Sequence, residues 1–96
     1  MKNVLLLGAT GSIGKSVLSV ISQNKESLNL IGISFNKNVL RYQEISEKHS
    51  PDFVYIEDHD SFKSLCSTDK ERYLNGNEEL ERLINRDDVD IIVLSL

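Results

Sequence analysis

The stretch GATGSIG at residues 8–14 combines residue types that can hold a phosphate group. Glycine permits a tight turn and lets an anion approach backbone N–H groups, and the hydroxyls of Thr10 and Ser12 can donate further hydrogen bonds. An apolar run precedes the stretch and helical spacing follows it, as a strand-turn-helix unit requires. This context predicts a dinucleotide-binding turn, with a mononucleotide or other phosphate site and a purely structural turn as alternatives. The candidate contacts are Gly8, Thr10, Gly11, Ser12, Ile13 and Gly14.

The end of the second apolar run bears on which dinucleotide would bind. A cofactor without a 2′-phosphate is usually held by Asp or Glu about 20 residues beyond the glycine turn. That position is Ser34, and residues 28–42 contain no carboxylate. The segment instead offers the Ser34 hydroxyl, the amides of Asn36 and Asn38, and the Lys37 ammonium. These groups suit a 2′-phosphate better than a carboxylate does. The segment therefore predicts NADPH, with a solvated loop and helix cap as the alternative. Phe35 either stacks near the adenine or packs against the sheet edge.

Short apolar runs alternate with amphipathic segments along the chain. Strands are predicted at residues 4–7, 28–33, 53–56 and 89–94, the last of them buried. Helical spacing joins Ile13, Val17, Val20 and Ile21, and it also joins Leu80, Leu83 and Ile84 in a helix that Asn77 can cap. Further helices are predicted at 39–49 and 60–66. Residues 71–74, closed by Asn75-Gly76, can form a short extra strand and turn. The pattern predicts an α/β fold: a doubly wound parallel sheet in three α/β/α layers, a Rossmann-like half with strand order 3-2-1-4.

Other polar groups receive structural interpretations. Glu57-Asp58-His59-Asp60 offers metal-ligating atoms, but neighbouring residues cannot all turn to one ion, so an exposed turn with a helix cap is predicted. His49 is expected on the surface at a helix C-terminus, where its protonated form suits the helix dipole. Cys66 is the only cysteine, and a structural or incidental role is expected for it.

Length and charge limit the remaining possibilities. The chain has 96 residues and a formal net charge of −4, which fits one small domain. Its 11 Lys and Arg residues are scattered and form no evident patch, which argues against a nucleic-acid surface. No segment approaches the roughly 20 apolar residues of a membrane span. A lone cysteine fits a reducing cytoplasm. The chain stops within a predicted strand, so we expect domain 1–96 to be truncated at its C-terminal end, without a catalytic and metal-binding domain.

Three features together resemble the 1-deoxy-D-xylulose 5-phosphate reductoisomerase family. They are the GATGSIG stretch, the segment Lys37-Asn38-Val39, and Asn75-Gly76 followed by an acidic helix and Asp88-Val89-Asp90. The resemblance runs over the whole chain and would cover only the NADPH-binding N-terminal part of such an enzyme. It implies that residues 10–13 contact the pyrophosphate and nicotinamide side, and residues 36–38 the 2′-phosphate end. The chain departs from the family's usual pattern at Ala9, Phe35 and Asn36.

The resemblance also implies a reaction. Members rearrange 1-deoxy-D-xylulose 5-phosphate and reduce the product with NADPH to 2-C-methyl-D-erythritol 4-phosphate, an oxidoreductase step in isoprene biosynthesis. Magnesium or manganese would be bound beyond residue 96, and the full-length enzyme would be a homodimer. The fragment itself is expected to bind NADPH and to catalyse nothing. The alternatives are the cofactor domain of another NADP-dependent enzyme, such as a semialdehyde dehydrogenase, and a non-catalytic nucleotide-binding module.

Overall fold

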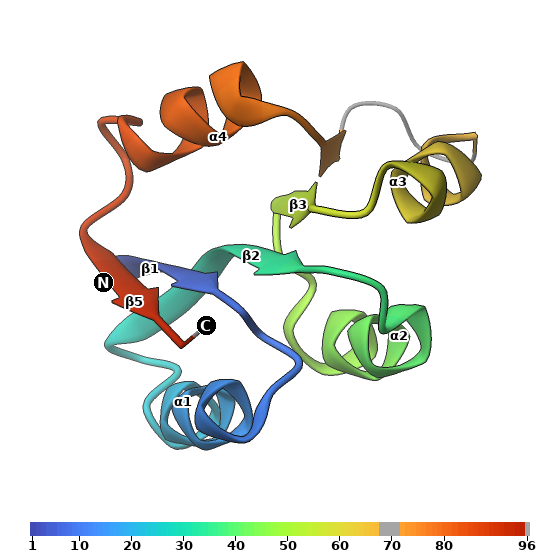
Figure 1. Ribbon diagram of the computed structural model, residues 1–96. Coiled ribbons are helices and arrows are strands. Elements are labelled where there is room, and N and C mark those ends of the chain that lie inside the picture. The colour runs from blue at the N-terminus through green and yellow to red at the C-terminus, as the bar shows by residue number, and fades with distance from the viewer. Residues whose placement is uncertain (68–71, 96) are drawn as a thin grey trace.

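Parallel strands form a single five-stranded sheet in the order β4-β3-β2-β1-β5, with helices on both of its faces (Figure 1). The structure is a computed structural model and describes residues 1–67 and 72–95. The strands are β1 (Lys2–Leu7), β2 (Leu28–Phe35), β3 (Phe53–Ile56), β4 (Tyr73–Leu74) and β5 (Ile91–Leu94). The helices are α1 (Ser12–Gln23), α2 (Val39–His49), α3 (His59–Cys66) and α4 (Asn77–Ile84).

The predicted doubly wound topology is confirmed, with one addition. The four apolar runs of the sequence lie in the expected 3-2-1-4 order, as β3-β2-β1-β5. The added strand, β4, pairs outside β3 through Val54 and Tyr73, and it comprises only two residues. Residue 71, where this short strand was predicted to begin, lies outside the described residues. A strand of this length carries too little periodicity for its place in the order to be read from sequence.

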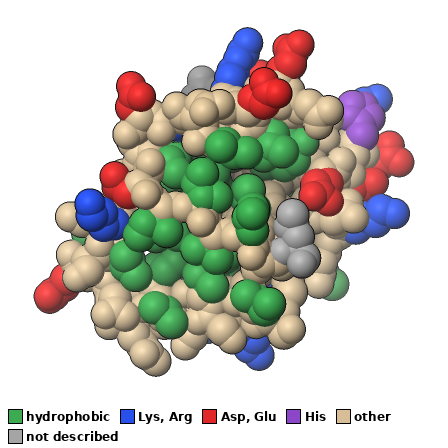
Figure 2. Space-filling view, turned by 60° about the vertical axis from the view of Figure 1, so that its left-hand side comes forward, with side chains coloured by type: hydrophobic (Ala, Val, Ile, Leu, Met, Phe, Trp, Pro, Cys, Tyr) green, Lys and Arg blue, Asp and Glu red, His purple; other side chains and the backbone are tan. Residues whose placement is uncertain are grey.

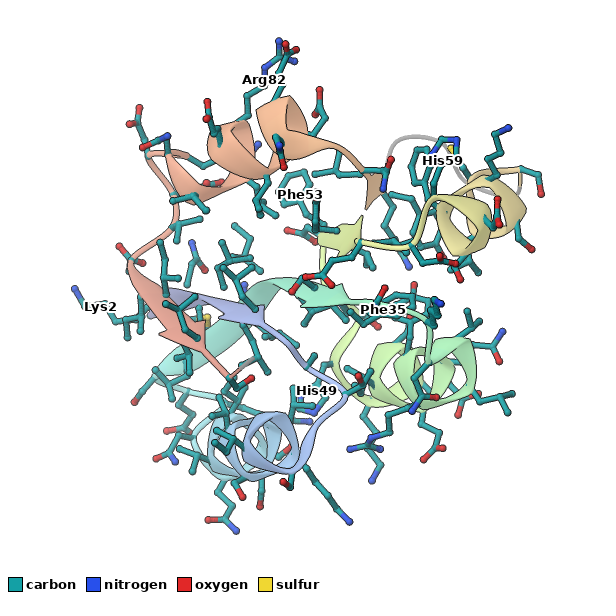
Figure 3. All side chains as sticks on the ribbon, in the orientation of Figure 1. Lys2, Phe35, His49, Phe53, His59 and Arg82 are labelled. Atoms are coloured by element: carbon teal, nitrogen blue, oxygen red, sulfur yellow. The ribbon has the colours of Figure 1, made fainter. Side chains whose placement is uncertain are left out.

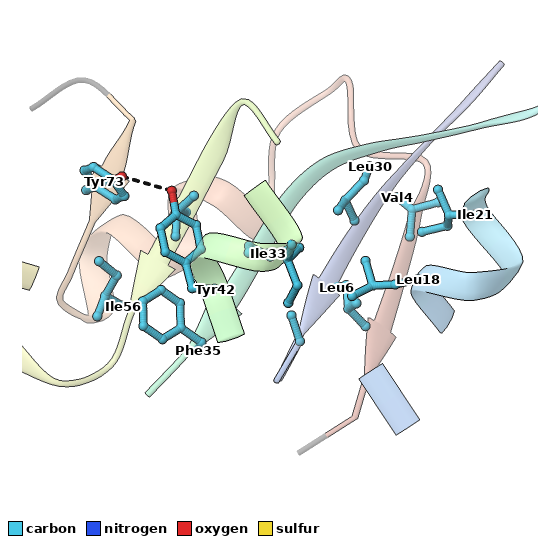
Figure 4. Packing of buried hydrophobic residues seen from close by; sticks show 13 residues of the cluster. Val4, Leu6, Leu18, Ile21, Leu30, Ile33, Phe35, Tyr42, Ile56 and Tyr73 are labelled. Carbon is cyan, nitrogen blue, oxygen red and sulfur yellow. Dashed lines mark hydrogen bonds between the residues drawn. The ribbon is translucent and has the colours of Figure 1, made fainter. Parts of the chain in front are cut away.

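The order of crossovers decides which helix covers which face. The chain moves outward from β1 to β4, so right-handed connections place α1, α2 and α3 on the same face of the sheet. On this face Leu6 and Leu18 belong to one buried cluster (Figure 4). Ile45 is also part of it, and partly buried residues of α3 pack against it. The chain then returns to β5 and places α4 on the opposite face, where Leu83 packs with Leu5 and Leu7. The result is the predicted three-layer arrangement.

An aromatic group closes the α2 side of the core. Phe35 stacks on Tyr42, with ring centroids 5.0 Å apart and planes 8° from parallel. The hydroxyls of Tyr42 and Tyr73 lie 2.9 Å apart and form a buried hydrogen bond (Figure 4). Phe35 is only 2% exposed. Of the two interpretations of this residue, packing is therefore correct, and its ring has no face free for an adenine.

Helix α1 is rotated relative to the face that its sequence spacing predicted. Ile13 and Val20 are 61% and 51% exposed, whereas Gly14, Leu18 and Ile21 are buried. Ile13 and Val20, which helical spacing grouped with Val17 and Ile21, therefore lie outside the buried face of the helix. Gly14 packs closely against the backbone of Ala9, and this contact sets the rotation of the helix.

Helix starts follow the prediction in one case and depart from it in another. Asp58 accepts a hydrogen bond from the backbone N–H of Ser61 at 3.1 Å, so the predicted exposed turn with a helix cap is confirmed at α3. Asn77, in contrast, is the first residue of α4 and not its cap. The N-cap is Gly76, which adopts φ 96° and makes no side-chain cap hydrogen bond. Glycine reaches this left-handed region without strain, and the sequence gives no sign that it takes the cap position here.

Strand β5 forms one edge of the described sheet and is more exposed than a buried strand. Ile91, Ile92 and Leu94 are 39%, 41% and 69% exposed, so the prediction of a buried strand here is wrong. Figure 2 brings this side of the molecule forward and shows hydrophobic side chains gathered on it. Among residues 1–67 and 72–95, no helix combines the length and apolar character needed to cross a bilayer.

Candidate functional site

The glycine turn between β1 and α1 is held in shape by Ser34 at the end of β2. Gly8 adopts φ 87°, a conformation that favours glycine. Its backbone N–H donates to Ser34 Oγ at 2.8 Å, and the N–H of Ala9 donates to the Ser34 carbonyl at 2.8 Å. Ser34 is 3% exposed. Its hydroxyl therefore faces the glycine turn, whereas the sequence assigned it to a 2′-phosphate.

Ser95 holds the same turn from the other side. Its hydroxyl donates to the carbonyl of Gly8 at 2.6 Å and lies 3.0 Å from that of Leu7, whose oxygen also accepts from the Ser95 N–H at 2.9 Å. Sequence reasoning missed this residue. The signal that was available is its position directly after a strand, at the carboxyl edge where ligands of such sheets bind.

The other two glycines of the turn have different roles. A Cβ added to Gly14 would lie 2.5 Å from the Ala9 carbonyl oxygen and 2.7 Å from that of Gly8. Gly14 is thus required for the helix to pack against the turn. A Cβ added to Gly11 would meet nothing within 4 Å. Gly11 is the N-cap of α1 and makes no side-chain cap hydrogen bond, so the first-turn N–H groups of this helix are left for an anion.

A pocket of about 190 Å³ opens at the carboxyl ends of the strands, beside the glycine turn. Of the predicted site residues it brings together Gly8, Thr10, Gly11, Ser34 and Asn36. Glu57 and Ser95, which the sequence did not assign to the site, also line it. Glu57 enters because its backbone N–H pairs with the Phe35 carbonyl at 2.9 Å, which places the end of β3 beside that of β2.

The remaining predicted residues flank this pocket or cap its helices. Asn38 accepts from the Arg41 N–H at 3.1 Å and so caps α2, as the alternative interpretation of this segment predicted. Hydrogen bonds from Ser61 lower the pKa of Asp58, and the Lys37 ammonium lowers it further. Lys37 is exposed and directly follows Asn36, which lines the pocket. Ser12, Ile13 and Gly14 form the first turn of α1.

Comparison with known proteins identifies the family of this chain. Residues 4–96 match the sequence profile of 1-deoxy-D-xylulose 5-phosphate reductoisomerase. The chain belongs to this reductoisomerase family. Curated reductoisomerases from Ruthia magnifica, Clostridium perfringens and Clostridium tetani are 34%, 36% and 37% identical to it, each over the whole of this chain. Each match covers 26% of the relative, so the chain spans about a quarter of their length.

Solved reductoisomerases share this fold. One crystal structure of the enzyme in complex with NADPH, fosmidomycin and magnesium superposes with a TM-score of 0.88 at 23% identity, over 100% of this chain and 24% of that one. The Zymomonas mobilis reductoisomerase in complex with NADPH gives 0.69 at 27% identity, over 82% of this chain and 22% of that one. The first likeness, at this level of identity, supports the fold.

The described part of this reductoisomerase-family chain does not fit a divalent cation. Within residues 1–67 and 72–95, no three His, Cys, Asp or Glu side chains are grouped so that they could hold a metal ion. Asp58 of the Glu57–Asp60 segment is engaged in capping, since its carboxylate also accepts from the Ser61 hydroxyl at 2.7 Å. We therefore assign no metal-dependent step to these residues.

A direct test of the turn geometry is the Ser34→Ala variant. The substitution leaves the Gly8 N–H without its buried acceptor, and we expect the free energy of unfolding to fall by about 1–2 kcal/mol. Urea denaturation followed by circular dichroism measures this change, with Ser64→Ala on an exposed part of α3 as the control. Equal midpoints for the two variants would contradict the role given to Ser34.

His49, the last residue of α2, differs from its prediction as a protonated surface residue. It is half-buried, and its Nε2 lies 3.4 Å from Ser22 Oγ on α1. Burial lowers the pKa of the ring below its usual 6.5, and Lys25, Lys48 and Arg41 lower it further. The positive form is thus disfavoured, because nearby cations and desolvation outweigh the favourable helix end.

This lowered pKa makes stability depend on pH. The folded pKa of His49 lies below the unfolded value of 6.5, so the unfolded chain binds more protons as pH falls through that value. We expect the free energy of unfolding contributed by His49 to decrease on acidification below this pH. Urea denaturation at neutral and mildly acidic pH should show a smaller loss for His49→Gln than for the parent chain. The exposed His59→Gln variant controls for the substitution, and identical losses in all three proteins would contradict this prediction.

Proposed function

We propose that this chain binds NADPH at the pocket beside the glycine turn, as the cofactor-binding part of a reductoisomerase. The observation that carries the proposal is the turn itself: Gly8 is fixed by Ser34 and Ser95, and Gly11 leaves the start of α1 open to an anion. Family membership supports the same function. The solved relatives in complex with NADPH support the choice of cofactor.

Charge around the pocket favours one orientation of the cofactor. We propose that the pyrophosphate lies against Thr10, Gly11, Ser12 and Ile13, where the positive end of α1 stabilises it. We place the 2′-phosphate beside the exposed Lys37, whose ammonium suits its charge, and Asn36 and the Asn38 amide nitrogen can donate to it.

The reaction of the whole protein is a further proposal. Supported by the family, we propose that it rearranges 1-deoxy-D-xylulose 5-phosphate and reduces the product with NADPH to 2-C-methyl-D-erythritol 4-phosphate. A divalent cation, magnesium or manganese, would be held by carboxylates outside the described residues, and the assembly would be a homodimer. The lone Cys66 supports a location in the reducing cytoplasm.

Cofactor choice is tested by titrating NADPH and NADH into the protein and following binding by calorimetry. We expect NADPH to bind more tightly, because only NADPH carries the 2′-phosphate that we place beside Lys37. Equal affinities would overturn the assignment of the 2′-phosphate site. Absence of binding by both cofactors would overturn the pocket as a dinucleotide site.

Catalysis is tested separately. We propose that residues 1–96 alone do not turn over substrate, because the described residues offer no grouped metal ligands. Incubation with 1-deoxy-D-xylulose 5-phosphate, NADPH and magnesium should therefore leave NADPH unoxidised. Substrate-dependent oxidation would contradict this proposal without affecting cofactor binding.

Family membership affects the two alternative functions, a semialdehyde dehydrogenase and a non-catalytic module, differently. Membership of the reductoisomerase family overturns the assignment to a semialdehyde dehydrogenase. A nucleotide-binding module without chemistry describes what we propose for residues 1–96 taken alone.

A further inference from the structure

A furrow runs between α1 and α2, away from the pocket beside the glycine turn. It encloses about 360 Å³ above the buried side chains of Leu18 and Ile45. A second hollow of about 260 Å³ continues it toward the turn after α1, and the two share Lys48 and His49. Figure 3 shows His49 between the two helices. No residue lining this furrow also lines the pocket beside the glycine turn.

The furrow gathers positive charge on an acidic chain. Its two hollows are lined by Lys15, Lys25, Arg41 and Lys48, whereas the formal net charge of the whole chain is −4. The one carboxylate along them is Glu44, which is paired with Arg41 at 3.3 Å. The cationic residues are scattered in the sequence, and the prediction that they form no patch is therefore wrong. A concave surface lined by one sign of charge concentrates ions of the opposite sign.

His49 lies where the two hollows meet, and the nearby positive charges change the pKa of its ring. The ring contacts Ser22 on α1, and the cations that act on it come from two segments: Arg41 and Lys48 on α2, and Lys25 after α1. Each of them lowers the pKa of the ring. The positive charge of the furrow therefore acts on the His49 ring, whose pKa can be measured separately from those of other groups.

We propose that the furrow between α1 and α2 binds a small multivalent oxyanion of the diphosphate class, at a site separate from the cofactor pocket. A diphosphate fits for three reasons. It carries enough charge to engage several of the four cations, its oxygens can accept from ammonium and guanidinium groups together, and it is small enough for the enclosed volume. The hydroxyl of Ser22 adds a neutral donor beside His49.

Inorganic diphosphate is the probe for the first experiment. The ring of His49 is titrated by NMR with and without diphosphate, at ionic strength matched by sodium chloride and without NADPH. Matching is essential, because salt alone screens the cations and raises the pKa. We expect diphosphate to raise the His49 pKa by about one unit beyond the salt effect, as an opposite charge within ~5 Å does. A rise no larger than that in sodium chloride means screening only and overturns the proposal.

Matched variants locate the site. Lys48→Gln and Lys25→Gln should each weaken diphosphate binding by about threefold to tenfold. Lys63→Gln, on the exposed surface of α3, should not change it. An equal loss in all three variants would show unspecific attraction and overturn the proposal.

Saturating NADPH separates the furrow from the cofactor pocket. If the sites are separate, the diphosphate effect on His49 persists in its presence. Loss of the effect would make the furrow an extension of the cofactor site and overturn the proposal. Failure of NADPH to bind at all would contradict the proposed function but would leave the titration of His49 by diphosphate as a valid test of the furrow.

Discussion

Replacing Gly14 by alanine is expected to lower the free energy of unfolding by about 3 kcal/mol, at the upper end of the usual cost of overpacking. The added Cβ would lie 2.5 Å from the carbonyl oxygen and 2.7 Å from the carbonyl carbon of Ala9. These are backbone atoms, so no side chain can rotate away to relieve the clash. Either α1 moves away from the sheet or the glycine turn distorts. Urea denaturation should show a lower midpoint, and NADPH affinity should fall with it.

Gly11→Ala is the matched control for this prediction. Its Cβ would meet nothing within 4 Å, and the residue has φ −84°, which alanine adopts freely. We expect its stability to stay within about 0.5 kcal/mol of the parent. NADPH affinity should nevertheless fall, because the Cβ projects where we place the pyrophosphate. Equal destabilisation by the two variants would contradict the distinction between a packing glycine and a binding glycine.

Replacing Lys37 by alanine is expected to weaken NADPH binding by about 1.5–3 kcal/mol, the usual worth of a hydrogen bond to a charged group. The lysine directly follows Asn36 of the pocket lining, and we place the 2′-phosphate beside it. NADH lacks this phosphate, so its affinity should not change. Calorimetric titration of both cofactors measures the difference.

Lys63→Ala controls for loss of a positive charge elsewhere on the molecule. It lies on the exposed surface of α3 and should leave both affinities unchanged. Unchanged NADPH affinity in Lys37→Ala would remove Lys37 from the site. A parallel loss for NADH would show that the lysine acts on the shared part of the cofactor.

Most of the fold could be predicted because the relevant signals are local. The four apolar runs and the glycine turn lie in short contiguous segments, and the right-handed crossover rule converts them into an order. The remainder depends on contacts that sequence spacing does not show. The rotation of α1 follows from Gly14 against Ala9, and the exposure of Ile13 results from it. Gly76 takes the N-cap position of α4 with a positive φ, and no sequence pattern predicted this backbone conformation.

The candidate site divides in the same way. Gly8, Gly11 and Gly14 were assigned from their spacing, since a strand and a helix flank them. Ser34 was assigned to a 2′-phosphate, and its contact with the turn was missed because the partner of its hydroxyl is a backbone N–H that lies 26 residues earlier in the chain. Glu57 was missed because it reaches the pocket only through the pairing of β2 with β3.

The contact between Ser95 and Gly8 links residues that are 87 positions apart. The glycine turn therefore cannot take its final shape when β1 and α1 first meet, but only after β5 has docked beside β1. Such long-range contacts form late and slowly in folding. A bound nucleotide would select chains whose sheet is complete, and it would protect the amides of β5 from hydrogen exchange as strongly as those of β1. NADPH bound at this turn, as we propose, would therefore favour the state in which β5 is paired with β1.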